Sequence, residues 1–302
     1  MIIREAKKTD INGIKIFLDK LYEYKFNNLY YDWQLFNNPN TLKIYLCSDN
    51  KKIVGLFGLQ LRTINNKIKC GQISWINIHQ NYRGQGIFDK LYKSIIPYTS
   101  KLDILFIFAN KSAIIPCEKI IGLKFIGELD RLLINLEKAK DKNCNYNLDR
   151  IVELNKYPNL YKGEAHYSFD QDQKYFTWRY KDNPVNNYYL VSTAMNRYSI
   201  IKTLDIDNKI IGDIVDYNCS NDAMLHYKKL IKSTIHALSS LDAKTIITWG
   251  ISSSKYRESL IECGFIPTKH ASYFGIKVLN SKYDYLYKFD NWNLVMSDAT
   301  NY

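Results

Sequence analysis

Residues 80–92 read Gln-Asn-Tyr-Arg-Gly-Gln-Gly-Ile-Phe-Asp-Lys-Leu-Tyr, with Gly84 and Gly86 one residue apart directly before a helical pattern. Glycine in such a turn permits positive φ and lets a ligand approach the backbone closely. The first N–H groups of the helix, those of residues about 85–88, have no intrahelical acceptor. Together with the helix dipole and Arg83 they predict an anion site that suits a pyrophosphate.

Two better-known phosphate-binding turns do not fit this stretch. A dinucleotide-binding turn needs a third glycine at position 89, where the chain has Asp89. A P-loop needs Gly-Lys followed by Ser or Thr, and the stretch lacks that sequence. Two glycines alone are weak evidence, so the elements around the turn have to decide the fold.

The first half of the chain alternates between strand-like and helix-like patterns. Asp10 is the expected cap of the first helix, and Gly122 is the expected end of the third. The expected strands are residues 1–6, 41–48, 51–64, 71–78, 103–110 and 123–136, and the expected helices are residues 11–25, 89–101 and 113–122. Residues 123–136 are expected to close the sheet of this half.

Part of this order recurs in the second half. Residues 31–39 (YDWQLFNNP) return as residues 176–184 (FTWRYKDNP), with both the tryptophans and the prolines 145 positions apart. Each proline is followed by a strand, a turn and a second strand. The polar run 138–149 is the expected linker, so we predict two copies of one α/β unit, residues 1–140 and 141–302.

Comparing the copies separates scaffold from chemistry. Trp33 and Trp178 occur in both and are expected to pack in the interior. Arg179 has Gln34 as its counterpart, so the charge is present in one copy only; both a surface position and a ligand contact fit it. Where the second copy should have a glycine turn, residues 218–229 read NCSNDAMLHYKK, without glycine or arginine. Asn221 or Asp222 is the expected helix cap there.

Composition sets wider limits. The 302 residues carry a net charge of +12, which fits an anionic partner but also an AT-rich composition abundant in Lys, Asn, Ile and Tyr. No apolar run reaches the ~18 residues of a membrane helix, and the N-terminus lacks the pattern of a signal peptide. We therefore expect a cytoplasmic protein without membrane insertion. The six scattered cysteines are expected to be reduced, and no histidine has metal-ligand spacing.

The order of elements and the turn resemble the GNAT acyltransferase superfamily over most of residues 1–136. Its pyrophosphate turn reads Arg or Gln, two arbitrary residues, Gly, one arbitrary residue, then Gly or Ala. Arg83 and Gly86 match this pattern, and Phe88 departs from it. The resemblance implies an α/β (α+β) fold of two tandem domains, each a mixed, mostly antiparallel sheet flanked by helices, the second of them degenerate.

The resemblance also implies that domain 1–140 binds acyl-CoA (acetyl-CoA or a short hydroxyacyl-CoA) as co-substrate, without a metal. Backbone groups of Ile76 and Ile78, beside Trp75, would bind the pantetheine amides. The side chain of Phe88 would alter packing beside the pantetheine arm. The other expected cofactor-binding residues are Arg83, Gly84, Gln85, Gly86, Ile87 and Phe88 in the turn, and Asn110 and Ser112 after the next strand.

The catalytic groups common in the family are missing. The tyrosine that often protonates the leaving thiolate is absent from the helix that contains Cys117, and strand 71–78 lacks the usual glutamate. Histidine is the side-chain type that ordinarily serves as a base near neutral pH, so His79 is the first candidate base, although it also fits a histidine in a solvent-exposed turn. Asn77 is a weaker candidate, as are Glu118 and Ser74. Cys117 is a candidate weak acid or a buried structural thiol.

The tandem arrangement and the WRYxxNP stretch resemble bacterial sugar N-acyltransferases. This resemblance implies an acceptor such as a dTDP-linked 3-amino-3,6-dideoxyhexose, used in surface polysaccharide (O-antigen, lipopolysaccharide) biosynthesis. Domain 141–302 would form part of the acceptor site, with Tyr175, Arg179 and Tyr180 as the expected substrate-binding residues. A positively charged chain suits an anionic acceptor and an anionic cofactor.

Three alternatives stay open. An aminoacyl-tRNA-dependent transferase would share the architecture, and the basic charge would serve tRNA phosphates. It would not need the glycine turn, so we do not expect nucleic acid as a partner. Acetylation of proteins or polyamines is a second alternative. A non-catalytic acyl-CoA-binding protein is the third, and the missing tyrosine and glutamate favour it.

Overall fold

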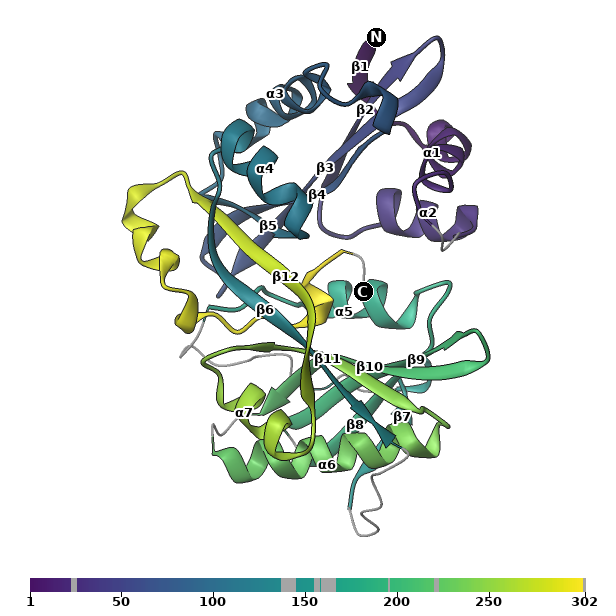
Figure 1. Cartoon of the computed structure of the whole chain (residues 1–302), viewed down its shortest axis with the longest axis vertical. Coiled ribbons are helices and arrows are strands. Elements are labelled where there is room, and N and C mark those ends of the chain that lie inside the picture. Colours follow the sequence, from purple (N-terminus) through teal and green to yellow (C-terminus); the bar gives the residue numbers. More distant parts are fainter. Residues whose placement is uncertain are drawn as a thin grey trace. The chain divides into compact units, whose positions relative to one another are not determined.

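The computed structural model forms two compact units, which we describe separately (Figure 1). Unit 1 comprises Met1–Ile126 and Tyr273–Tyr287, and unit 2 comprises Gly127–Ser272 and Lys288–Tyr302. The residues that the structure describes are 1–22, 26–136, 145–154, 158, 167–194, 196–219 and 223–300. The predicted domain boundary between residues 140 and 141 lies outside them, as does most of the predicted linker.

Unit 1 contains a sheet with the strand order β1-β2-β3-β4-β5-β12. Every neighbouring pair is antiparallel except β4 and β5, which are parallel. The strands are β1 (Ile2–Glu5), β2 (Leu42–Asp49), β3 (Lys52–Ile64), β4 (Ile68–Ile78), β5 (Ile104–Ala109) and β12 (Ile266–Val278). The helices are α1 (Ile11–Leu18), α2 (Asn28–Phe36), α3 (Ile87–Thr99) and α4 (Ile114–Ile121).

Local sequence explains the turns of this sheet. Asn50 and Lys51 join β2 to β3, and Asn65 and Asn66 join β3 to β4, all four with positive φ. Two consecutive residues with positive φ form the turn whose twist matches that of a hairpin, and asparagine tolerates this conformation well. Gly122 has φ 79° and ends α4 as predicted.

Helices cover both faces of the sheet of unit 1 (Figure 1). The core between the sheet and α3 and α4 includes Phe57, Ile73, Leu91 and Leu105. The residues of β3 that alternate with this core, Leu56, Gly58, Gln60, Arg62 and Ile64, lie on the opposite face, where α1 and α2 pack. We call these two sides the α3 face and the α1/α2 face.

Unit 2 repeats the arrangement with the strand order β6-β11-β10-β9-β8-β7. Its strands are β6 (Lys124–Asn135), β7 (Asn147–Arg150), β8 (Tyr188–Ala194), β9 (Arg197–Ile206), β10 (Lys209–Cys219) and β11 (Thr245–Ile251). Its helices are α5 (Gln173–Phe176), which continues as a π-helix over Thr177–Lys181, α6 (Met224–Ser240) and α7 (Lys255–Glu262). The core packs β8–β11 against α6 and α7. These two units confirm the predicted fold class.

The register demonstrates the repeat more sharply than the sequence does. In unit 1 the parallel pairs are Cys70–Ile104, Gly71–Leu105 and Gln72–Phe106. In unit 2 they are Ile211–Thr245, Gly212–Ile246 and Asp213–Ile247, each residue 141 positions after its counterpart. In both copies the strands part after three pairs. Trp33 and Trp178, the tryptophans that occur in both copies, are buried as predicted.

One strand assignment was wrong. Residues 123–136 do not close the sheet of unit 1: they form β6, whose residues 129–135 pair with β11 in unit 2. The sheet of unit 1 is closed by residues 273–278 of β12, which pair with β5. Both strands are apolar and follow a helix that ends at glycine, so local sequence does not distinguish their partners.

The first helix also differs from its prediction. α1 ends at Leu18, and residues 23–25 of the expected helix lie outside the described part of the chain. Asp10 stands at the N-cap without a side-chain cap, because its carboxylate accepts two hydrogen bonds of 2.7 Å from Arg4. The helices in the described ranges include none with the length and hydropathy of a membrane-spanning segment.

The last described residues of the chain lie against β10 of unit 2. Asp216 is buried, and its Oδ2 accepts hydrogen bonds from Gln171 Nε2 at 2.8 Å, Tyr180 Oη at 3.0 Å and Ser297 Oγ at 3.1 Å. Its Oδ1 accepts the Tyr217 N–H at 2.7 Å. One carboxylate thus joins β10, the π-helix and the tail.

Replacing Asp216 by alanine should therefore destabilise unit 2 strongly. The change leaves several buried donors without an acceptor, and breaking such a network costs about 3–5 kcal/mol. Urea denaturation measures the loss, with Asp205→Ala, an exposed position on β9, as the control that should stay within ~0.5 kcal/mol of the parent. Equal denaturation midpoints for the two variants would contradict this role of Asp216.

Candidate functional site

The glycine turn has the geometry of an anion site. Gly84 has φ 75° and Gly86 has φ 69°, and Gly86 is the N-cap of α3. Both conformations favour glycine over any residue with a Cβ. A Cβ built on either glycine would have no atom within 4 Å, so the space beside the turn is open. The first N–H groups of α3 point out of the helix at this position.

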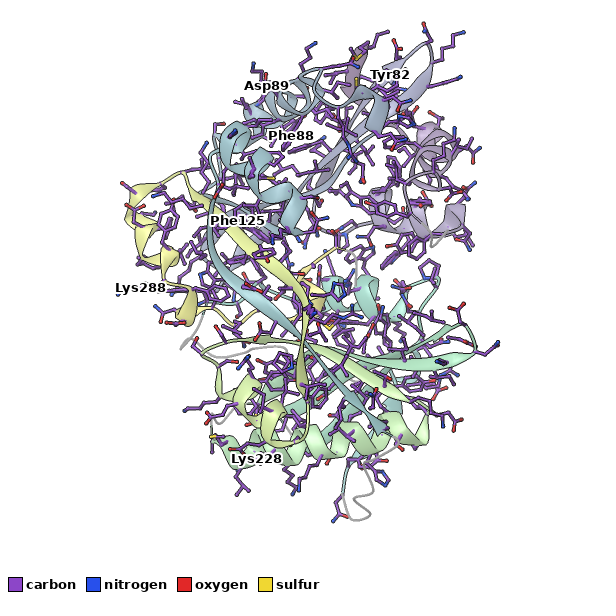
Figure 2. The ribbon with its side chains drawn as sticks, viewed as in Figure 1. Tyr82, Phe88, Asp89, Phe125, Lys228 and Lys288 are labelled. Atoms are coloured by element: carbon purple, nitrogen blue, oxygen red, sulfur yellow. The ribbon has the colours of Figure 1, made fainter. Side chains whose placement is uncertain are left out.

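Hydrogen bonds fix the backbone before the turn. Arg83 Nε donates to the Ile78 carbonyl at 3.2 Å, which ties the exposed arginine to the end of β4. Gln85 Nε2 donates to the Asn81 carbonyl at 3.1 Å. Tyr82 Oη donates to Asp49 at 3.1 Å, and this hydrogen bond raises the pKa of Tyr82. Figure 2 labels Tyr82 before the turn and Phe88 and Asp89 after it.

Phe88, which stands where the turn pattern has Gly or Ala, places its side chain in the core of unit 1. Ile87 and Phe88 are buried on the α3 face, and the ring of Phe88 lies 5.9 Å from that of Phe57. Asp89 forms an ion pair of 2.6 Å with Lys93, one turn along α3. The aromatic side chain therefore packs inward while the backbone of residue 88 still begins the helix.

Strand β4 comes shortly before this turn in the sequence, and its pairing with β5 stops before the strand itself ends. After the pair Gln72–Phe106, β4 continues to Ile78 and β5 to Ala109 without further register pairs. A β-bulge between Ser74 and Asn77 adds one residue to β4 against β3, and Trp75 takes φ 55°. Such a bulge bends the strand and increases its twist. Ile76 and Ile78, the predicted pantetheine contacts, follow the bulge.

Asn110 and Ser112 follow the end of β5. Asn110 Oδ1 accepts hydrogen bonds from the Ala113 N–H at 3.1 Å and from Ser112 Oγ at 2.8 Å. The two exposed side chains thus shape the turn after β5 together. Their predicted place beside the cofactor stays a prediction.

Two of the predicted catalytic residues, Asn77 on β4 and His79 directly after it, each accept a hydrogen bond from another part of unit 1. His79 Nδ1 accepts a hydrogen bond from the Asn81 N–H at 3.3 Å and so caps the short turn before Arg83. A base needs a free lone pair towards the substrate, and in this arrangement the other ring nitrogen carries the proton when the ring is neutral. Asn77 Oδ1 accepts the hydroxyl of Tyr22 at 2.6 Å. These contacts favour the turn-histidine interpretation of His79.

Cys117 lies in the interior. Its side chain belongs to the core on the α3 face and has no exposed surface. Burial raises the pKa of the thiol to about 12, with a further rise from the carboxylate of Glu118. A thiol in this place is a structural one and is poorly suited to deliver a proton to a leaving thiolate.

The predicted substrate-binding residues of unit 2 are buried too. Tyr175, Arg179 and Tyr180 are at most 4% exposed. Arg179 donates to the Ala299 carbonyl at 2.9 Å, Tyr175 Oη donates to the Ser297 carbonyl at 3.4 Å, and Tyr180 Oη donates to Asp216. The predicted contact with a sugar requires exposed side chains, whereas these hold the tail. Arg179 was predicted to be either a surface residue or a ligand contact, and the structure shows instead a buried residue that binds the tail.

The net charge is concentrated in unit 1. Its residues include 21 Lys and Arg against 10 Asp and Glu, whereas those of unit 2 include 21 against 20. Composition shared by the whole chain does not explain this difference. The positive field therefore belongs to the unit with the glycine turn, where it favours anionic ligands.

Residues 211–216 of unit 2 correspond to the opening of unit 1 but carry different chemistry. With the offset of 141, Gln72 corresponds to Asp213 and Trp75 to Asp216. Asp213 forms a buried ion pair of 3.6 Å with Lys202, and desolvation raises the pKa of this carboxyl group. The tail residues around Ser297 contact β10 at its bulge. Within the described ranges, no group of three or more His, Cys, Asp or Glu side chains could hold a metal ion.

This geometry agrees with the comparisons to known proteins. Residues 2–111 match the family of acetyltransferase (GNAT) domains. No match to a curated protein was found.

Solved structures share the fold over both units. A GCN5-related N-acetyltransferase from Anabaena variabilis is 13% identical with a TM-score of 0.63, over 93% of this chain and 73% of that one. A tandem GNAT protein from the clavulanic acid biosynthesis pathway is 11% identical with a TM-score of 0.63, over 92% and 98%. Saccharomyces cerevisiae N-myristoyltransferase with bound myristoyl-CoA is 12% identical with a TM-score of 0.65, over 91% and 82%.

The sequence predicts the glycine turn but not the bulge in β4. From the sequence, Trp75 is expected only to lie beside the pantetheine-binding residues of its strand, and Ser74 is expected only as a weaker candidate base. A signal was present in Gly58, because a glycine inside an apolar strand often marks a bulge or a close approach in the neighbouring strand. Gly58 pairs with Ser74 at the bulge.

We expect Gly86→Ala to weaken binding of coenzyme A about tenfold or more, because a methyl group would enter the open space beside the turn and disturb hydrogen bonds to phosphate. Isothermal titration with coenzyme A measures the dissociation constant. The matched control is Gly122→Ala, which carries the same strain of a Cβ at positive φ (79°) but lies at the end of α4. Equal affinities for both variants would remove the glycine turn from the cofactor site.

Cys117 should make the stability of the protein depend on alkaline pH. The pKa of its thiol rises from an ordinary 9.0 to about 12 in the folded state, so the unfolded chain loses this proton first. Stability should then fall between about pH 9 and 12, by up to ~1.4 kcal/mol per pH unit from this group. Denaturation of the parent and of Cys117→Ala across this range isolates the effect, and parallel curves would contradict it.

Proposed function

We propose that this protein transfers an acyl group from acyl-CoA to the amino group of a nucleotide-linked amino sugar. The observation that carries the acyl-CoA part is the pair of glycines at positive φ at the start of α3, beside a parallel strand pair that opens after three residues. The match of residues 2–111 to the GNAT acetyltransferase domain supports the same activity.

Acyl transfer needs an unprotonated amine beside the thioester carbonyl. The amine nitrogen bonds to the carbonyl carbon, the C–S bond breaks, and the departing thiolate takes up a proton while the nitrogen loses one. Placing the two reactants together supplies much of the rate through effective molarity. Because His79, Asn77 and Cys117 are occupied or buried, we propose that the proton passes to water, and positioning then becomes the main contribution of the chain.

The positive charge of unit 1 suits an anionic acceptor. Unit 1 includes 21 Lys and Arg against 10 Asp and Glu, and this excess attracts a nucleotide-linked substrate through its phosphates. The same charge repels a cationic polyamine, so the nucleotide-linked acceptor is the favoured one.

The nucleotide-linked sugar is supported by the charge of unit 1 and by the tandem arrangement that resembles sugar N-acyltransferases. The buried WRYxxNP stretch gives it no support of its own. We place the proposed activity in the synthesis of surface polysaccharide on the same resemblance. We propose acetyl-CoA or a short hydroxyacyl-CoA as the acyl donor.

Aminoacyl-tRNA is the less favoured co-substrate. A tRNA-dependent enzyme does not need a pyrophosphate-binding turn. The excess positive charge is also confined to one unit, whereas a long polyanion such as tRNA is bound by an extended basic surface. A non-catalytic acyl-CoA-binding protein would share the turn and the opening. Activity measurements separate these alternatives from the proposed enzyme.

Release of free thiol from acetyl-CoA and a hydroxybutyryl-CoA should rise at least tenfold over background with a dTDP-linked amino sugar. The control acceptor is the same amino sugar without its nucleotide, which should react more slowly because it lacks the pyrophosphate charge. Thiol release with aminoacyl-tRNA, lysine peptides or polyamines instead would reject the sugar class. Tight binding of acetyl-CoA without thiol release on any amine would identify a sensor.

A further inference from the structure

Two hydrogen-bond donors on consecutive residues of β4 are buried without a partner. Ser74 is 7% exposed, and neither its Oγ nor Trp75 Nε1 has a hydrogen-bond partner among the described residues. Buried polar groups are nearly always paired, because an unmade hydrogen bond costs about 1–3 kcal/mol. An indole N–H only donates, so the missing partner of Trp75 has to be an acceptor.

The bulge brings these two donors to the same side of the sheet. Consecutive residues of a regular strand point to opposite faces. Here, a Cβ built on Gly58 would lie 3.0 Å from Ser74 Oγ and 3.2 Å from Trp75 Cδ1, the ring atom bonded to Nε1. Both side chains therefore lie over Gly58 on the α1/α2 face. The left-handed conformation of Trp75, with φ 55°, is the kind of backbone strain that concentrates at functional sites.

This pair of donors stands where β4 leaves β5. The last parallel register pair is Gln72–Phe106, so Ser74 is the next residue of β4 on the α1/α2 face. Phe108 is the next residue of β5 on that face, and its ring lies 5.2 Å from that of Phe274 on β12. The opening is thus flanked by two donors on one strand and by an aromatic pair on the other.

Other buried hydroxyl groups without a partner do not share this setting. Ser233 on α6 is also buried and unpaired, and so are Tyr256 and Ser259 on α7, but these hydroxyl groups lie within helices and no two of them are on consecutive residues. Only at Ser74 and Trp75, among the described residues, are two such donors adjacent at a strained bulge beside a strand opening.

We propose that Ser74 Oγ–H and Trp75 Nε1–H donate hydrogen bonds to the carbonyl oxygen of the acyl group of acyl-CoA. This inference rests on the proposed binding of acyl-CoA in unit 1. When the amine nitrogen bonds to the carbonyl carbon, the π electron pair moves to this oxygen. When the C–S bond breaks, the pair returns to the carbonyl and the thiolate leaves with the electrons of the C–S bond. Donors held in place before the reaction stabilise the charge on the oxygen.

The test compares two ligands that differ at one group. Acetyl-CoA has a carbonyl group, whereas S-ethyl-CoA has a CH2 group in its place and lacks the oxygen. The parent protein should bind acetyl-CoA about three- to tenfold more tightly than S-ethyl-CoA. Ser74→Ala and Trp75→Phe should each bring this ratio towards one without changing the affinity for S-ethyl-CoA. Ser259→Ala, which removes a buried unpaired hydroxyl from unit 2, should keep the parent ratio.

The outcomes separate this inference from the proposed function. Equal affinities for the two ligands in the parent, or an unchanged ratio in both variants, would overturn the role of the two donors while leaving acyl-CoA binding intact. Failure of the parent to bind either ligand would overturn the proposed function as well. The melting temperature of each variant checks its folding, and the two variants remove separate donors, so that one folded variant suffices for the ratio.

Discussion

The parting of β4 from β5 after three register pairs is the constraint on which the proposed chemistry depends. The bulge bends β4 and increases its twist, and the strand leaves its parallel neighbour at this point. The bulge at Trp75 therefore has three consequences in unit 1. It ends the pairing at Gln72–Phe106, leaves strand edges that can hydrogen-bond a ligand, and turns two consecutive side chains to one face. The glycine turn follows nine residues after Trp75, so that anion binding and the opening belong to one continuous stretch of chain.

The second unit shows what this scaffold does without the turn. Its strands part at the corresponding residues, yet the position of Trp75 is held by Asp216, a carboxylate that binds Gln171, Tyr180 and Ser297. The polar groups at this bulge are satisfied by the chain itself. A buried carboxylate with several donors is stable in that place, whereas it would repel the phosphates of a cofactor. The same geometry is thus used for internal packing in one copy and left open in the other.

Much of the fold and part of the site could be predicted from the sequence. Alternating apolar residues identified most strands, Gly122 gave the end of α4, and the spacing of Gly84 and Gly86 gave the anion turn. The candidate catalytic groups were less predictable. His79 and Cys117 have suitable chemistry as residue types, but a capping hydrogen bond and complete burial, respectively, decide what they do. Likewise, the arginine found in one copy only is an interior residue that holds the tail, which no local pattern indicates.

The sequence by itself determined most of the strands, the repeat and the glycine turn, because these depend on residues close together in the chain: glycines at positive φ, asparagines in hairpins and apolar periodicity. Only the tertiary structure decided that β12 rather than β6 completes the sheet of unit 1, that the positive charge lies in one unit, and that Ser74 and Trp75 share a face. These features depend on pairing between residues far apart in the chain. Two strands with the same local pattern could each pair with either sheet, and the sequence does not show which pairing is the more stable. A bulge can be recognised only from the register with the neighbouring strand.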